Sequence, residues 1–296
     1  MTMTKLKKNL APRLKQCKEL LYLLRRNRLT WIALLFIIFL VVIAILAPYI
    51  VPYPSHISQT ANPVDKLLSP RAEYWFGTDE LGRDIFSRIV YGTRISLGAS
   101  LGAVTLAIAI GATLGAIAGS MGGIVDNIIM RITDVFLSFP SLLLAILIAA
   151  FTSPNLTNAL IAIAISWWPW YARIVRGQAI SLKERQFVRA ARAIGTSKPQ
   201  IIFTHILPNC IAPVIVQASM DFGGVILTLA SLSFLGLGAK APLPEWGLMI
   251  NTSKTYFLNA WWYSVFPGAA IFLTVLAFNL LGDGLREILD PKTKNK

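Results

Sequence analysis

Long apolar runs constrain the fold of this chain more than any other feature. A helix that crosses a bilayer needs about 20 mostly apolar residues, and six stretches of the sequence approach or exceed that length. Only 14% of the 296 residues are charged, whereas soluble domains carry about 25%. We therefore predict an all-α polytopic membrane protein with six transmembrane helices. The six runs cover residues 31–52, 95–119, 128–151, 158–174, 211–237 and 260–281.

The positive charges indicate how these helices are oriented. The net charge is +14, and its surplus is concentrated in residues 1–30 and in a basic island over 173–209. Lys and Arg are retained on the cytoplasmic side of membranes, so both stretches are predicted to be cytoplasmic. The C-terminal tail, 285–296, falls on the same side, whereas the charge-balanced segment 54–94 is expected outside. No soluble basic face is visible, so nucleic acid is not an expected partner.

Within the basic island, the spacing of apolar residues predicts two short helices. The first would run over 184–194, with one face made of residues three and four positions apart. Gly195 is suited to end it in the left-handed conformation. The second would begin near Lys198 and end at Pro208. The residues that we expect to matter in this segment are Glu184, Phe187, Arg189, Ala190, Ala191, Gly195, Leu207 and Pro208.

The paired alanines, the glycine and the sequence Ile206-Leu207-Pro208 resemble the "EAA" loop of the membrane subunits of bacterial ABC importers. Three further stretches, 76–97, 122–140 and 232–292, resemble the C-type permeases of dipeptide, oligopeptide and nickel importers. Together the resemblance covers residues from about 30 to 292. The sequence departs from the family at Arg189, where the loop usually has a Glu. We expect Arg189 to pair with a carboxylate of a partner or with lipid.

The resemblance implies a type I importer permease fold, with an anchor over 31–53, a permease core over 95–284 and a coupling loop over 184–208. It also implies a place in a bacterial inner membrane, where the chain would form half of a pathway for a di- or oligopeptide. The expected partners are a second homologous permease, two cytoplasmic ATPases, an extracytoplasmic solute-binding protein and membrane lipid. No phosphate-binding loop occurs in the sequence. ATP and Mg are therefore expected on the ATPases, and the chain itself is expected to be non-catalytic and to bind no cofactor.

Asp221 is the notable charge within an apolar run, where a carboxylate is costly unless it meets water or a partner. It is either a group of the translocation path or a structural hydrogen-bond acceptor. One alternative function is import of nickel or a metal chelate by the same architecture. An ion-driven secondary transporter would need more intramembrane charges and inverted repeats. A hydrolase at Ser100 would need a strand-to-helix turn.

Glycines recur at four-residue spacing in the second run, at positions 98, 102, 111, 115 and 119. In lipid, where apolar side chains gain little by meeting each other, small residues allow helix backbones to approach closely. We therefore predict close helix packing along this run.

Overall fold

Helices form most of the protein in a computed structural model that describes residues 24–25, 27–58 and 61–289. In these ranges, extended pairing is limited to one bridge between Thr78 and Asp84. Most of both predicted tails, 1–30 and 285–296, lies outside the described residues. The long helices are α2 (Arg28–Ile50), α3 (Ile85–Met121), α6 (Leu156–Leu182), α9 (Ile211–Phe234) and α11 (Trp261–Leu289). The shorter ones are α4 (Gly123–Leu137), α5 (Ser141–Ala150), α7 (Gln186–Ala193), α8 (Lys198–Gln200) and α10 (Trp246–Ser253).

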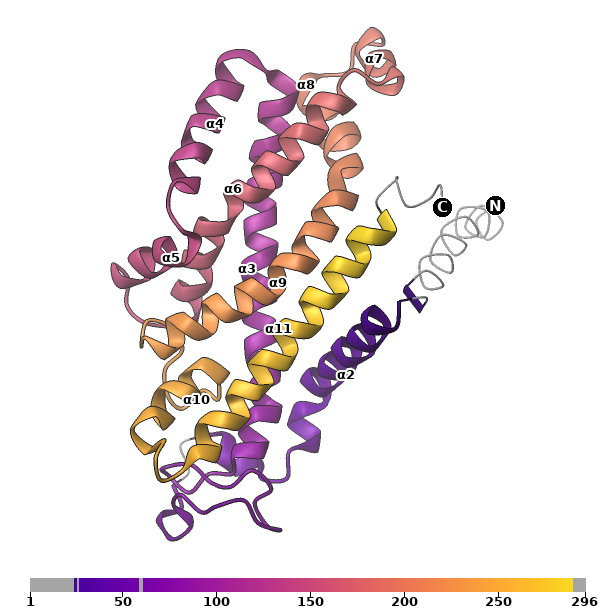
Figure 1. Ribbon diagram of the computed structural model, residues 1–296. Helices are drawn as coiled ribbons and strands as arrows, with labels where there is room; N and C mark the ends of the chain where they lie inside the picture. The colour runs from indigo at the N-terminus through magenta and orange to yellow at the C-terminus, as the bar shows by residue number, and fades with distance from the viewer. Residues whose placement is uncertain (1–23, 26, 59–60, 290–296) are drawn as a thin grey trace.

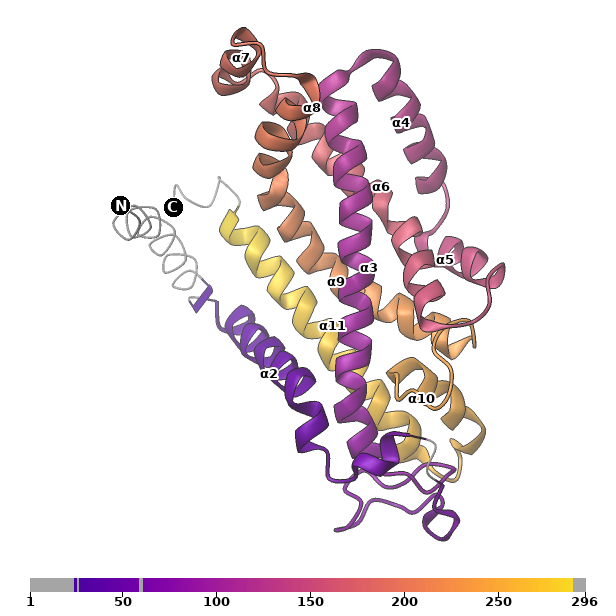
Figure 2. The same ribbon diagram turned by 180° about the vertical axis from the view of Figure 1, so that it is seen from behind.

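Helix α3 runs through the middle of the molecule, and the other long helices pack around it (Figures 1 and 2). Helix α2 lies to one side of α3, and α4 and α5 lie to the other, while α11 crosses α3 diagonally from the end near α10 towards the side of α2. The short helices α7 and α8 form one end of the molecule, while α10 and the segment 51–84 form the opposite end. The largest buried apolar cluster joins α3, α6, α9, α10 and α11, with Ile163, Leu229 and Trp246 among its members.

Close packing of α3 against α6 depends on glycine, as the sequence predicts. Gly111, Gly115 and Gly119 recur every four residues on α3. A Cβ added at any of them would overlap a backbone carbonyl oxygen of α6, namely that of Trp168, Ala172 or Arg176. Gly98 differs, because a Cβ there would meet no atom within 4 Å. The predicted ladder is therefore confirmed for its C-terminal half.

Within the described part of the chain, four helices are long and apolar enough to cross a membrane: α2, α3, the continuous stretch Lys198–Phe234 and α11. The helices α4 and α5 meet the same criterion only as a pair bent by 88°. Helix α6 has 27 residues, which span about 40 Å, but its Trp, Pro and Arg residues make it less apolar. Each of the six predicted runs thus corresponds to a helix or to a bent pair.

The third predicted run, 128–151, is wrong as a single helix. Helix α4 ends at Leu137 and α5 begins at Ser141. Pro140 stands between them with φ −57° and ψ 128°. Proline has no amide hydrogen to donate and disfavours helical backbone in the residue before it. The chain therefore turns sharply at this point.

The second predicted run begins earlier than expected, at Ile85 instead of residue 95. Asp84 caps the helix, since its carboxylate accepts the Ser87 amide hydrogen at 2.8 Å. The predicted outer segment 54–94 therefore contains the first turns of α3, and the charged Arg88 and Arg94 concealed them in the sequence. Ser100 lies inside the same helix and not at a strand-to-helix turn, so the hydrolase interpretation is wrong.

Candidate functional site

The segment 184–208 forms the end of the molecule where α7 and α8 lie (Figure 1). Helix α6 ends at Leu182, shortly before the segment, and α7 occupies Gln186–Ala193. After α8 the chain continues through a π-helical stretch, Ile201–Ile206, and a 3-10 stretch, Leu207–Cys210, into α9. The segment is therefore joined covalently to two long helices, α6 before it and α9 after it.

Pro208 does not end the second helix, contrary to the prediction. The stretch Lys198–Phe234 forms one continuous helix that is long enough to cross a membrane. The change from π to 3-10 geometry occurs at Leu207, so the helix accommodates a residue that lacks an amide hydrogen. Leu207 is half-buried against the cluster below α7, and Pro208 is exposed.

The end of α7 confirms the predicted role of Gly195. Its φ is +84°, in the region that favours glycine. The Thr196 amide donates to the Ala191 carbonyl at 3.1 Å, and the Gly195 amide donates to the Arg192 carbonyl at 3.0 Å. These two bonds form a Schellman motif, which satisfies carbonyl groups at the helix end. Gly195 therefore fixes the point at which the chain leaves α7.

Helix α7 has two faces, and the predicted grouping of its apolar residues is partly wrong. Ala191 is 7% exposed and, with Val188, packs into a cluster with Ile202 and Ile206. Consecutive residues point about 100° apart around a helix, so Ala190 faces outward while Ala191 faces inward. The outer face also carries two exposed apolar side chains, Phe187 and Ile194, which are 44% and 84% exposed.

Arg189 has a carboxylate partner within its own segment. Its guanidinium donates to Glu184 at 2.9 Å, and both side chains are more than half exposed. This hydrogen bond lowers the pKa of Glu184. An exposed pair of this kind contributes little stability. Only Nη2 of Arg189 is engaged by Glu184, so the other donors of this exposed guanidinium remain available to further acceptors.

Asp221 lies on α9 and is partly exposed. The Gln217 amide donates to its Oδ1 at 2.8 Å. The fully buried hydroxyl of Tyr171, on α6, interacts electrostatically with the carboxylate but does not meet hydrogen-bond geometry. Oδ2 therefore has no hydrogen-bond partner among the described residues. Gln217 lies on α9 as well, so this bond does not decide between a path group and a hydrogen bond to a neighbouring helix, and both stay predictions.

A buried charge cluster at the opposite end was not singled out from the sequence. Asp79 is fully buried, and its carboxylate accepts from Arg83 at 2.7 Å. Arg88, on α3, lies 3.5 Å from the same carboxylate and donates to the carbonyl oxygens of His56 and Pro242 at 3.2 and 3.4 Å. These bonds attach the segment 51–84 and the loop before α10 to α3. The close spacing of opposite charges over 79–88 is the sequence feature that could have indicated this cluster.

Burial shifts the pKa of several groups beside this cluster. It lowers the pKa of His56, against the opposing effect of nearby carboxylates. The His56 Nδ1 accepts the Asp84 amide hydrogen at 3.0 Å, which requires a neutral ring. Burial also raises the pKa of Asp84. It raises that of Tyr74 to about 12, with help from a hydrogen bond to Asp65. The cluster is thus arranged around an uncharged His56.

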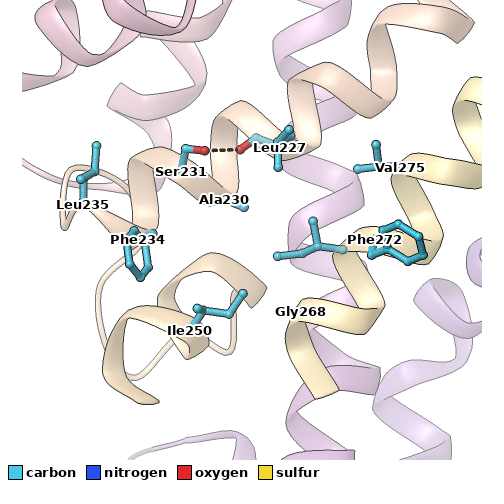
Figure 3. A pocket seen from close by; sticks show the side chains of 10 residues that line it. Leu227, Ala230, Ser231, Phe234, Leu235, Ile250, Gly268, Phe272 and Val275 are labelled. Atoms are coloured by element: carbon cyan, nitrogen blue, oxygen red, sulfur yellow. Dashed lines mark hydrogen bonds between the residues drawn. The ribbon is translucent and has the colours of Figure 1, made fainter. Parts of the chain in front are cut away.

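Figure 3 shows a hollow of about 570 Å³ between α9, α10 and α11. Among its described lining residues, Ser231 carries the one polar side chain, and its hydroxyl donates to the Leu227 carbonyl at 2.8 Å. Burying an unpaired charge is costly, so this hollow does not suit a substrate with charged ends. It is lined by Leu227, Ala230, Ser231, Phe234, Leu235, Ile250, Gly268, Ile271, Phe272 and Val275.

Two family models match the chain. Residues 111–295 match the model described as binding-protein-dependent transport system inner membrane component. Residues 16–70 match the N-terminal TM domain of oligopeptide transport permease C. The first match covers more than half of the chain and includes the whole segment 184–208.

Several curated proteins are similar over most of their length. The dipeptide transport system permease protein DppC of Alkalihalophilus pseudofirmus is 51% identical, with 92% of this chain and 88% of that protein covered. The probable D,D-dipeptide transport system permease protein DdpC of Escherichia coli is 46% identical over 94% of this chain and 92% of that protein. The glutathione transport system permease protein GsiD of Shigella flexneri is 49% identical over 91% of this chain and 88% of that protein.

Solved structures of importers share the fold. A chain of the MetNI methionine ABC transporter in inward-facing conformations aligns with a TM-score of 0.52 and 19% identity, covering 69% of this chain and 96% of that one. A chain of an amino acid ABC transporter with histidines aligns with a TM-score of 0.50 and 18% identity, covering 69% and 95%. The family models, the curated relatives and the fold agree, and the chain belongs to the family of inner-membrane components of binding-protein-dependent transport systems, the permeases of ABC importers.

Proposed function

We propose that this chain is a permease subunit of an ATP-driven importer and that it forms half of a translocation path for di- or oligopeptides. The observation that carries the substrate class is the similarity to permeases named for dipeptide, D,D-dipeptide and glutathione transport. All three names denote peptides or peptide-like molecules. This favours peptides over the alternative cargo, nickel or a metal chelate.

We infer that ATP and Mg bind to two partner ATPases and that the outer face of α7 docks on one of them. Support comes from Phe187 and Ile194, which are apolar and exposed at the end of a helix bundle. Exposed apolar side chains grouped on one surface are typical of protein interfaces. The continuous helix that begins at Lys198 offers a route by which movement of the docked segment reaches the membrane. The chain itself would then need no cofactor and would catalyse no reaction.

The other expected partners occupy other surfaces. A second, related permease would pack against the apolar flank that includes the hollow in Figure 3. An extracytoplasmic solute-binding protein would dock at the opposite end from α7, on the segment 51–84 and the loop 238–259. In this arrangement both termini are cytoplasmic, and lipid covers the exposed apolar side of α2. Asp221 would line the path and meet a cationic part of the substrate.

Uptake into proteoliposomes tests this proposal. The chain would be reconstituted with its partner permease, ATPases and binding protein, and radiolabelled dialanine would be the transported probe. We expect accumulation that requires hydrolysable ATP on the side of the ATPases. A non-hydrolysable ATP analogue is the control, and unlabelled dialanine competes while nickel does not.

Two outcomes would contradict the proposal. Uptake driven by a proton gradient in vesicles that lack the ATPases would identify a secondary transporter. Competition by nickel, with none by any di- or oligopeptide, would identify the alternative cargo. The two results separate the energy source from the substrate class.

A further inference from the structure

Helix α4 lies on the outside of the molecule (Figures 1 and 2). Thr133 is its one described residue that is buried, and Ile124 and Ile128 are 77% and 56% exposed. Gly122 and Gly123, which join it to α3, have φ values of +67° and +57°. A Cβ at either glycine would meet no atom within 4 Å. The turn is therefore open at both glycines.

Two ion pairs join α4 to α6, beside an edge contact between the rings of Phe136 and Trp168, whose centroids lie 5.5 Å apart. Arg176 donates from Nε and Nη2 to the two oxygens of Asp126 at 2.6 and 2.7 Å. Arg173 donates to Asp134 at 2.7 Å. The Arg176–Asp126 pair is bidentate, and its side chains are 36% and 14% exposed. The Arg173–Asp134 pair has a single hydrogen bond, and both of its side chains are about half exposed. Paired hydrogen bonds between charged groups fix direction as well as distance.

Both arginines lie on the part of α6 that leads directly to the segment 184–208. Helix α6 ends at Leu182, two turns or less after Arg176. Gly119 of α3 also packs closely against the backbone carbonyl of Arg176. A displacement of the segment 184–208 would therefore act on α6 through the covalent connection between them. From α6 it would act on α4 through the side chains of these two arginines.

We propose that the Asp126–Arg176 pair is a strut that positions α4 on α6, so that the bent pair α4–α5 moves with the segment 184–208. The pair acts as a positioning device for transport and contacts no nucleotide. The inference rests on the proposed coupling role of that segment. It goes beyond that role by naming the side chains that carry the motion into α4, the helix that is not covalently continuous with the segment.

Distances between spin labels in the assembled complex test the strut. Labels on Ile128→Cys and Ile180→Cys report the separation of α4 and α6, and labels on Ile128→Cys and Leu273→Cys report that of α4 and α11. All three positions are more than a third exposed. Cys17→Ser removes one native thiol, and Cys210 is 1% exposed. We expect ATP to change the α4–α11 distance and to leave the α4–α6 distance unchanged.

Substitutions of the pair give the second readout, dialanine transported per ATP hydrolysed. We expect Asp126→Asn to broaden the α4–α6 distances and to lower this ratio about tenfold. Arg176→Lys keeps the charge but loses the bidentate geometry. Its transport ratio should lie between those of the unchanged protein and Asp126→Asn. The swap Asp126→Arg with Arg176→Asp should restore both readouts. Asp134→Asn is the matched control at the exposed pair, with a change under about threefold.

An α4–α6 distance that changes with ATP as much as the α4–α11 distance would overturn the strut, and this result needs no variant of the pair. An unchanged ratio and unchanged distances in Asp126→Asn would overturn it as well. If α7 is not the coupling element, Gly195→Val will leave the transport ratio intact. That outcome contradicts the proposed function and not the strut.

Discussion

Replacing Gly195 by Val should uncouple ATP hydrolysis from transport. The backbone at this position has φ +84°, and a residue with a Cβ loses about 1–2 kcal/mol in the left-handed region. For a β-branched side chain we take about 2 kcal/mol, near the upper end of that range. A Cβ there would meet no atom within 4 Å. Space for the Cβ itself is therefore available, and the cost that we count is one of backbone conformation.

This energy acts locally, because the Schellman bonds of Thr196 and Gly195 close only the last turn of α7. A cost of 2 kcal/mol shifts the balance between formed and frayed helix end by roughly 30-fold. The core below α7 also contains Val188 and the isoleucines after α8, which lie outside the turn that frays. We therefore expect insertion into the membrane and complex assembly to be retained.

The assay is the ratio of dialanine transported to ATP hydrolysed by the reconstituted complex. We expect this ratio to fall at least tenfold in Gly195→Val while ATP hydrolysis persists. Gly195→Asn is the matched control, because asparagine tolerates the left-handed region, and it should retain most of the ratio. Full coupling in the Val variant, or equal losses in both variants, would refute the reasoning.

Three further outcomes are expected. Gly115→Leu should lower the stability of the protein in detergent by about 3 kcal/mol or more, because its side chain would meet the α6 backbone, whereas Gly98→Leu should change it little. The free energy of unfolding should fall as pH falls below about 6.5, by up to about 1.4 kcal/mol per pH unit. The reason is that His56 has a lowered pKa in the fold, where its neutral ring accepts a hydrogen bond. His56→Asn should flatten that dependence in thermal unfolding at pH 7.5 and 5.5. A membrane-impermeant thiol reagent should label Val64→Cys in intact cells but Ile194→Cys only after permeabilisation, and the reverse pattern would contradict the proposed orientation.

The membrane character of the fold could be predicted from the sequence because apolar length is itself the constraint. The positions of five runs followed from hydropathy, and the glycine spacing indicated a close helix approach along α3, although it did not identify α6 as the partner. The bend at Pro140 could not be read with the same certainty, since a proline within an apolar run is often accommodated in a transmembrane helix. The early start of α3 was hidden because its first turns carry Arg88, which is buried beside Asp79, and the exposed Arg94.

The candidate site could be predicted less completely. The left-handed conformation of Gly195 at the end of α7 was predicted correctly, because a helix cap is a local property of the backbone. The inward position of Ala191 was missed, because the π and 3-10 stretches that shape its neighbour, Ile202, have no distinct sequence pattern. The partners of Arg173 and Arg176 lie about 40 and 50 residues away in the sequence, and a single sequence does not indicate such pairings.

The docking of α7 on an ATPase is the central claim, and site-specific photo-crosslinking tests it most directly. A benzophenone amino acid would replace Ile194, which is 84% exposed on the outer face of α7, or Leu258, which is 95% exposed near α10 at the opposite end. We predict that the probe at position 194 crosslinks to the ATPase subunit in the assembled complex and that the probe at 258 does not. Crosslinking of the ATPase from 258, or its absence from 194 in a complex that still hydrolyses ATP and transports dialanine, would contradict the account.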